Sequence, residues 1–380
     1  MTRIKCSGRD AISGDRITIE FDDVIQNLDP AFSDVPDDVY IAPGFIDIQV
    51  NGFAGVDYNA PDAPVEDIAR SLRVMFSTGV SRCFPTVITG DPERMLGALR
   101  NLAAAREALP EGSAMEAFHV EGPHISPEDG PRGAHPERWV RPPDVDEYKR
   151  WQEAANGNVR LVTLSPEWPE AARYIDMLSR DGVVASIGHT KATAAQIQDA
   201  VSAGATLSTH IGNGAHAVMS RHPNYIWEQL AEDRLNASMI VDGIHIGPAF
   251  LKVALRAKGV ERSVLITDAV MPAMCKPGRY LLGEVEVELH ADHSVRMFGG
   301  TRLAGSSLRM DKGVENLMKI AGLTLAEAIT MATTNAARAG RLGGRIRGLQ
   351  PGSRADVVKF RLADGKLEVL ETYVSGSRVF

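Results

Sequence analysis

Short apolar runs alternate with amphipathic segments from about residue 43 to residue 345 of the chain. The runs are rich in Val, Ile, Leu and Ala, which is typical of strands buried on both faces of a parallel sheet. The segments between them carry apolar residues every three or four positions and often begin at proline, as at Pro92 and Pro248, which is typical of helices. The predicted strands are 44–50, 82–88, 114–120, 160–164, 183–188, 205–209, 237–241 and 263–267.

Eight strands that alternate with helices predict a (β/α)8 barrel, an α/β fold of the TIM-barrel type. In such a barrel the strands are parallel, so the residues at their carboxyl ends meet at one rim, where barrel enzymes hold their active sites. The strand tips are therefore where we expect the chemistry. The predicted helices include 65–78, 92–108, 169–181, 192–203 and 248–258.

The two ends of the chain, 1–42 and 346–380, differ from this central part. They alternate polar and apolar residues without a helical period, as in 16–21, which is typical of antiparallel strands. We expect them to pair as one small β-sandwich domain beside a catalytic barrel that spans 43–345. Within the barrel we expect a long loop over 125–148 and an inserted β-hairpin near 283–300.

Composition and charge exclude several classes of protein. The 380 residues leave room for a barrel, which commonly takes ~250 residues, and one smaller domain. The net charge of −8 without Lys or Arg clusters argues against nucleic acid or an anionic membrane as a partner, and no stretch approaches the ~18 apolar residues of a membrane span. The three cysteines lie at unrelated spacings, which favours a reducing compartment over a disulfide framework. We expect a cytoplasmic protein.

Polar residues gather at the predicted strand tips. The segment 183–214 reads as a strand, a helix and a second strand, with His189 and His210 at the two strand ends. Two imidazoles and one carboxylate with an open position form a catalytic zinc-type site, and a second carboxylate can accept the proton of the attacking water. Asp268 fits that second role. The polar residues at the tips are Asp47, Gln49, Asn51, His119, Glu121, His189, His210, Asp242, His245 and Asp268.

Some of these residues have simpler interpretations. His119 precedes Glu121 by two positions and points to the same side, but a hydrogen-bonded core histidine is the favoured interpretation. Asp47 is expected to be structural. Asp242, after the seventh strand, is either a site residue or a helix cap.

Six short motifs resemble the amidohydrolase superfamily and, within it, most closely the N-acetylglucosamine-6-phosphate deacetylases. In chain order they are Ala-Pro-Gly-Phe-Ile-Asp at 42–47, His-Val-Glu-Gly-Pro at 119–123, Gly-His-Thr at 188–190, Thr-His at 209–210, Thr-Asp-Ala at 267–269 and Leu-Ala-Gly-Ser at 303–306. The resemblance implies that Glu121, His189 and His210 bind a divalent metal, usually Zn²⁺, with Fe²⁺, Mn²⁺ and Co²⁺ as alternatives. Many barrel amidohydrolases carry His-x-His on the first strand and bind two metals. Here Gln49 and Asn51 stand in those places, so we expect one metal.

The resemblance also implies roles around the metal. Asp268 is the expected general base and later the acid that protonates the leaving amine, and His135 is expected to contact the substrate and polarise the carbonyl. Some of the contacts to the sugar phosphate are expected to reach across a homodimer interface. The residues expected to hold it are Asn213, Gly214, Arg221 and His245.

The leading hypothesis is therefore hydrolysis of the acetamide of N-acetylglucosamine 6-phosphate to glucosamine 6-phosphate and acetate. The segment 210–223 departs from the family at Gly212, and its added His216 and His222 could enlarge the phosphate site or signal another ligand. N-acetylgalactosamine 6-phosphate or an unphosphorylated sugar stays open as the substrate. A cyclic-amide hydrolase ranks lower, because 160–164 lacks a lysine, and a metal-free scaffold has no need of the ligands and the base together.

Overall fold

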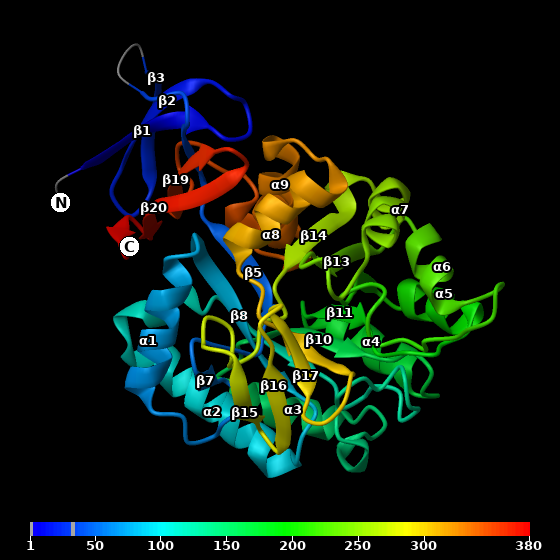
Figure 1. Ribbon diagram of the computed structural model, residues 1–380. Coiled ribbons are helices and arrows are strands. Elements are labelled where there is room, and N and C mark those ends of the chain that lie inside the picture. The colour runs from blue at the N-terminus through cyan, green and yellow to red at the C-terminus, as the bar shows by residue number, and fades with distance from the viewer. Residues whose placement is uncertain (1–2, 32–34) are drawn as a thin grey trace.

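The computed structural model describes residues 3–31 and 35–380, and its centre is a ring of parallel strands (Figure 1). Chain order and spatial order agree around the ring, as the sequence predicts for a (β/α)8 barrel. Hydrogen bonds just beyond the first and last strands close it: Asp268 N donates to Gln49 O at 2.9 Å, and Asn51 N donates to Ala269 O at 2.7 Å. The strands are β5 (Phe45–Val50), β8 (Val80–Ile88), β9 (Phe118–Glu121), β10 (Val159–Leu164), β11 (Val184–Ile187), β12 (Ala205–Ser208), β13 (Asn236–Ile240) and β14 (Ser263–Ile266).

Helices surround the ring, and local signals in the sequence set their starts. Asp91 accepts hydrogen bonds from the first turn of α2 and Pro92 follows it, while Thr193 and Gln196 form a capping box at the start of α5. No helix of 3–31 and 35–380 is both long and apolar enough to cross a membrane. The helices are α1 (Val65–Phe76), α2 (Pro92–Ala108), α3 (Val145–Ala154), α4 (Ala171–Arg180), α5 (Ala194–Ser202), α6 (Tyr225–Ala231), α7 (Pro248–Lys258), α8 (Met310–Asn316), α9 (Leu325–Ala332) and α10 (Thr334–Ala339).

The third strand is shorter than predicted. The prediction of a strand from residue 114 is wrong at its start, because Pro110–Ala114 forms a 3₁₀ turn and β9 begins at Phe118. Pro110 opens that turn, and Gly112 packs so closely on α2 that a Cβ there would lie 2.2 Å from Arg106 O. Glu121 is the last residue of β9.

The two chain ends pair, as expected, and their strands form a single seven-stranded sheet at one end of the barrel (Figure 1). Arg82 of β8, fully buried, joins the two parts through Asp356, to which its Nε and Nη2 donate at 2.9 and 2.7 Å. Residues 1–2 and 32–34 of the predicted terminal domain lie outside the described residues, and the domain boundaries stay predictions. In spatial order the sheet contains β21 (Ser377–Arg378), β20 (Lys366–Val374), β19 (Val357–Ala363), β4 (Val39–Pro43), β1 (Ile4–Asp10), β2 (Arg16–Phe21) and β3 (Ile25–Pro30).

An antiparallel sheet follows β14, and we call it the insertion sheet. The predicted hairpin is β16 (Val285–Leu289) with β17 (Ser294–Met297), and β15 (Gly278–Leu282) and β18 (Leu303–Ser306) extend it on both sides. A bridge between Ala269 and Ser306 ties it to the end of β14. A two-strand hairpin, β6 (Gly52–Phe53) with β7 (Val56–Asp57), follows β5.

The barrel interior has an apolar layer below and a polar layer above. The apolar layer includes Ile48, Phe84, Leu161, Val184, Leu207, Ile240 and Ile266, from strands on all sides of the ring. Two residues further along, Thr163 of β10 and Thr209, just past β12, hydrogen bond to each other at 2.7 Å. Buried His119 joins this layer, because its Nε2 lies 2.8 Å from Thr163 Oγ1, and burial lowers its pKa to about 4. His119 is thus a neutral, hydrogen-bonded core histidine beneath the strand tips.

Candidate active site

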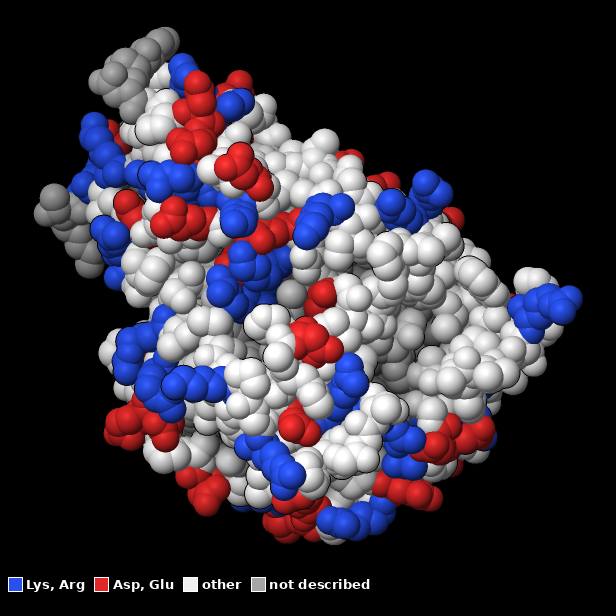
Figure 2. All heavy atoms as spheres, viewed as in Figure 1, with Lys and Arg blue, Asp and Glu red and all other residues white. Residues whose placement is uncertain are grey.

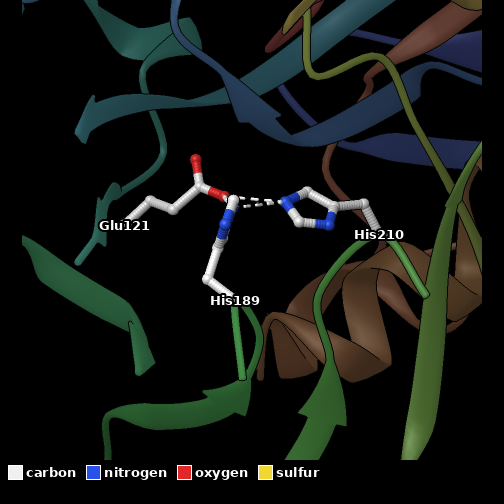
Figure 3. A group of neighbouring side chains, drawn as sticks. All are labelled: Glu121, His189 and His210. Atoms are coloured by element: carbon white, nitrogen blue, oxygen red, sulfur yellow. Dashed lines mark hydrogen bonds and ion pairs between the residues drawn. The ribbon is translucent and has the colours of Figure 1, made fainter. Parts of the chain in front are cut away.

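Three side chains from the carboxyl ends of three barrel strands converge (Figure 3). Glu121 ends β9, His189 follows β11 and His210 follows β12, and all three are buried. Glu121 Oε1 lies 3.1 Å from His189 Nε2 and 2.8 Å from His210 Nε2, and the two Nε2 atoms are 3.1 Å apart. Ligands at ~2.1 Å from one tetrahedral ion stand ~3.4 Å from each other. The spacing of these donor atoms therefore fits a single metal ion.

A hydrogen bond behind the triad prepares one of its nitrogen atoms as a ligand. His189 Nδ1 donates to Pro131 O at 2.8 Å, which leaves the lone pair on Nε2 directed at the centre of the group. Burial alone would raise the pKa of the Glu121 carboxyl, but the His189 and His210 rings against its Oε1 hold the pKa well below the usual range. Glu121 is therefore a carboxylate at neutral pH, and the set offers two imidazole nitrogens and one charged oxygen, which suits Zn²⁺ and related ions.

The backbone at this rim is strained. His189, His210 and Asp268 each come directly after or within two residues of a strand end and have positive φ values of 49°, 28° and 49°. Non-glycine residues rarely adopt this conformation, and it is typical of functional sites. It turns three side chains from three different strands toward the same mouth of the barrel.

Asp268 faces the triad from the end of β14. Its Oδ1 accepts hydrogen bonds from Asn51 Nδ2 at 2.6 Å and from Gln49 Nε2 at 3.2 Å. The two amides at the tip of β5 thus bind this carboxylate. Burial, with the nearby Glu121 charge, raises the pKa of Asp268 to about 6. With Oδ1 occupied by two donors, Oδ2 is left to take or give a proton.

His135 stands beside the triad on the loop after β9. Its ring packs edge-on against that of His189 with centroids 4.4 Å apart, and its Nδ1 lies 2.7 Å from Thr89 Oγ1. Burial lowers the pKa of His135 to about 3, so the ring is neutral. When the Thr89 hydroxyl donates to Nδ1, Nε2 carries the hydrogen and can donate it to a substrate oxygen.

One cavity contains the triad, Asp268 and His135. Asn213, Gly214 and His245 also line it. Gly214 needs to be glycine, since its φ is 55° and a Cβ would lie 2.6 Å from His189 Nδ1. Figure 2 shows a hollow on the face in view, between the insertion sheet and helices α5 and α6, bordered mostly by uncharged side chains.

The comparisons with known proteins agree with this geometry. The model of the amidohydrolase family matches residues 40–379. The chain belongs to the amidohydrolase family. This amidohydrolase is 32% identical over 348 residues to the N-acetylglucosamine-6-phosphate deacetylase of Bacillus subtilis (strain 168), covering 91% of this chain and 86% of the relative. It is 33% identical over 337 residues to the N-acetylgalactosamine-6-phosphate deacetylase of Escherichia coli O157:H7, covering 88% and 86%.

A solved structure gives the same result over the whole length of the amidohydrolase. A variant of the N-acetyl-D-glucosamine-6-phosphate deacetylase of Mycobacterium smegmatis, in complex with N-acetyl-D-glucosamine-6-phosphate, superposes with a TM-score of 0.90 at 29% identity and full coverage of both chains. The fold and the family are thereby shown, and they make the chain a metal-dependent hydrolase of amide bonds.

Not every residue expected at the amidohydrolase site lies there. Arg221 is exposed on the loop between β12 and α6 and does not line the cavity within its own chain. His216 is held by Glu128 Oε1 and Tyr225 Oη, both at 2.9 Å, so it fastens its loop to the loop after β9 and to α6, and it does not line the cavity. Asp242 accepts from the backbone of residues 244 and 245 and from His245 Nδ1 at 2.6 Å, so it orients His245 and caps no helix.

Sequence reasoning missed two features of the amidohydrolase site. It named no residue after the second strand, although Thr89 there holds His135. A hydroxyl residue at that tip was the available signal. It also gave no role to the apolar residues of the insertion sheet, such as Leu282 and Val287, which line the cavity.

Proposed function

We propose that this amidohydrolase removes the acetyl group of N-acetylglucosamine 6-phosphate and releases acetate and glucosamine 6-phosphate. The observation that carries the proposal is the convergence of Glu121, His189 and His210 opposite Asp268. The relatives of the chain are named as N-acetylglucosamine-6-phosphate deacetylases, which supports the same activity here. The relative that acts on N-acetylgalactosamine 6-phosphate makes that epimer the second candidate substrate.

The proposed cofactor is one divalent ion per chain, Zn²⁺ before Fe²⁺, Mn²⁺ or Co²⁺, held by Glu121, His189 and His210. The donor set supports one ion, because Gln49 and Asn51 are already hydrogen bonded to Asp268 and amides are poor zinc ligands. An ion held there would lower the pKa of water at the site toward ~7 and would polarise the amide carbonyl.

Side chains of the protein carry out the proton transfers. Asp268 Oδ2 takes a proton from the attacking water, while Asn51 and Gln49 hold Oδ1. His135 Nε2 donates to the carbonyl oxygen, where negative charge develops. Asp268 finally passes its proton to the nitrogen as the C–N bond breaks, so the products are a carboxylate and an amine.

Asn213, Gly214 and His245 are proposed to hold the sugar. Asp242 supports this role for His245, because it accepts from Nδ1 and leaves Nε2 directed elsewhere. We place the phosphate contact of Arg221 in a homodimer, in which the exposed loop of one protomer reaches the cavity of its partner. Val218 on the same loop is 88% exposed, so the loop projects away from its own chain, as reaching a partner requires. The three cysteines are free thiols, which supports a cytoplasmic location.

The test is acetate release by zinc-loaded protein from N-acetylglucosamine 6-phosphate, N-acetylgalactosamine 6-phosphate and unphosphorylated N-acetylglucosamine. Fast release from the first substrate is expected. If the second is hydrolysed faster, the epimer assignment is wrong. No release from any of the three, in protein that holds one metal per chain, would refute the proposed activity.

A further inference from the structure

The cavity extends from the metal triad in two directions of different chemistry. One part, the polar arm, is lined by Asn213, Gly214 and His245, after strands β12 and β13. The other part, the apolar arm, lies between the end of β8 with the start of α2 and the insertion sheet. Its apolar lining residues are Ile88, Met95, Trp139, Leu282, Val285 and Val287.

The apolar arm is a continuous wall built from distant segments of the chain. Trp139 Nε1 donates to Glu284 Oε2 at 3.2 Å, which fixes the loop after β9 against the β15–β16 turn. Gly283 N donates to Asp57 Oδ2 at 2.9 Å and anchors the same turn to the hairpin after β5. Val287 is completely buried in the small core of the insertion sheet.

The groups that act on the amide decide which arm each end of the substrate enters. His135, the proposed donor to the carbonyl oxygen, is fastened to Thr89 at the end of β8, on the side of the apolar arm. Asp268, the proposed donor to the leaving nitrogen, follows β14, and His245 follows the neighbouring β13. The nitrogen and its sugar therefore extend into the polar arm, which leaves the apolar arm as the space for the carbon chain of the acyl group.

We propose that the apolar arm is an acyl-chain site and that the enzyme hydrolyses N-acyl amino sugars whose acyl group is longer than acetyl, such as propionyl and butyryl. This inference rests on the proposed function and widens its substrate class. The reaction is unchanged: water adds to the carbonyl carbon, the C–N bond breaks, the acyl group leaves as a carboxylate and the nitrogen takes up the proton.

An acetyl group places one methyl at the entrance of this arm and leaves the rest of the apolar wall without a substrate contact. Burying one methylene contributes ~0.8 kcal/mol, which is roughly a fourfold gain in kcat/KM per added carbon while the chain still fits.

Charged residues also line this part of the cavity, but two of them are already engaged in hydrogen bonds within the protein. Asp91 caps α2, and Glu284 accepts from Trp139 and Arg138. Arg94 also lines the cavity, so an acyl chain ending in a carboxylate is the competing occupant.

The experiment compares kcat/KM of the zinc-loaded enzyme for glucosamine 6-phosphate carrying acetyl, propionyl, butyryl, hexanoyl or succinyl groups. We expect propionyl and butyryl to equal or exceed acetyl. A tenfold or greater fall from acetyl to propionyl overturns the acyl-chain site while the deacetylase function stands. Faster hydrolysis of succinyl than of butyryl also overturns it, in favour of an anion held by Arg94. Release from none of the substrates refutes the proposed function as well.

Two neighbouring residues of β15 provide matched variants. Leu282 lines the cavity, whereas Leu281 is 57% exposed. Leu282→Trp should lower the butyryl-to-acetyl ratio of kcat/KM at least tenfold, and Leu282→Ala should move the optimum to a longer chain. Leu281→Trp should change neither the ratio nor the activity. The same chain-length profile in all three variants would overturn the assignment of the arm.

Discussion

The hydrogen bond from Asn51 to Asp268 gives a quantitative test of the proposed base. Asn51→Ala removes the donor that stands 2.6 Å from Asp268 Oδ1. A hydrogen bond to a charged group contributes ~1.5–3 kcal/mol, and one pKa unit corresponds to ~1.4 kcal/mol, so the pKa of Asp268 should rise by roughly one to two units. Because the donor stabilises the charged form, its loss favours the protonated form, which cannot accept a proton from water.

The assay is the pH dependence of kcat/KM for the metal-loaded enzyme. The acidic limb of the variant should move to higher pH by roughly one to two units, with most of the activity recovered on its alkaline side. Gln49→Ala removes the longer bond of 3.2 Å and should give a smaller shift in the same direction. The metal content of each variant serves as the control. An unmoved acidic limb in Asn51→Ala, with metal and fold intact, would show that Asp268 is not the group that limits the acidic side.

Three further predictions address the metal, the phosphate contact and stability. His210→Ala should abolish the rise in melting temperature on adding zinc, a stabilisation of ~4 kcal/mol at 1,000 times the Kd, whereas His119→Asn should keep it; equal responses would place the metal elsewhere. Arg221→Ala should raise KM for a phosphorylated substrate far more than for its unphosphorylated analogue, and an equal rise would remove Arg221 from the phosphate contact. Burial raises the pKa of Asp47 to about 7, from an ordinary 3.8, so this group favours folding below pH ~4 and that contribution is lost as the pH rises through 7. Asp47→Asn should therefore gain stability over the wild type by up to ~4 kcal/mol at pH 8 and none at pH 4 in urea titrations; a constant difference would contradict this.

The strand order was predictable because parallel strands buried on both faces appear in the sequence as short apolar runs. The barrel rule then brings Glu121, His189, His210 and Asp268 to one rim despite their separation along the chain, and the structure places them there. Their chemical roles stay predictions until they are measured.

The features that could not be predicted from the sequence depend on contacts between distant residues, which composition does not encode. The pairing of Asn51 with Asp268 joins residues 217 positions apart and depends on side-chain orientation at the barrel mouth. The late start of β9 follows from the close approach of Gly112 to α2, and the exposed position of Arg221 follows from the path of a long loop. Both depend on tertiary packing, for which periodicity gives no signal.

The left-handed backbone at His189, His210 and Asp268 sets stability against activity. Each such residue costs ~1–2 kcal/mol that a glycine would not, so Asp268→Gly would relax the chain and keep the three metal ligands while it discards the proposed base. Laboratory evolution that selects for heat resistance alone would reward this loss. Any programme to make this enzyme more robust should therefore hold the three positions fixed and look for stabilising changes elsewhere, away from the barrel rim.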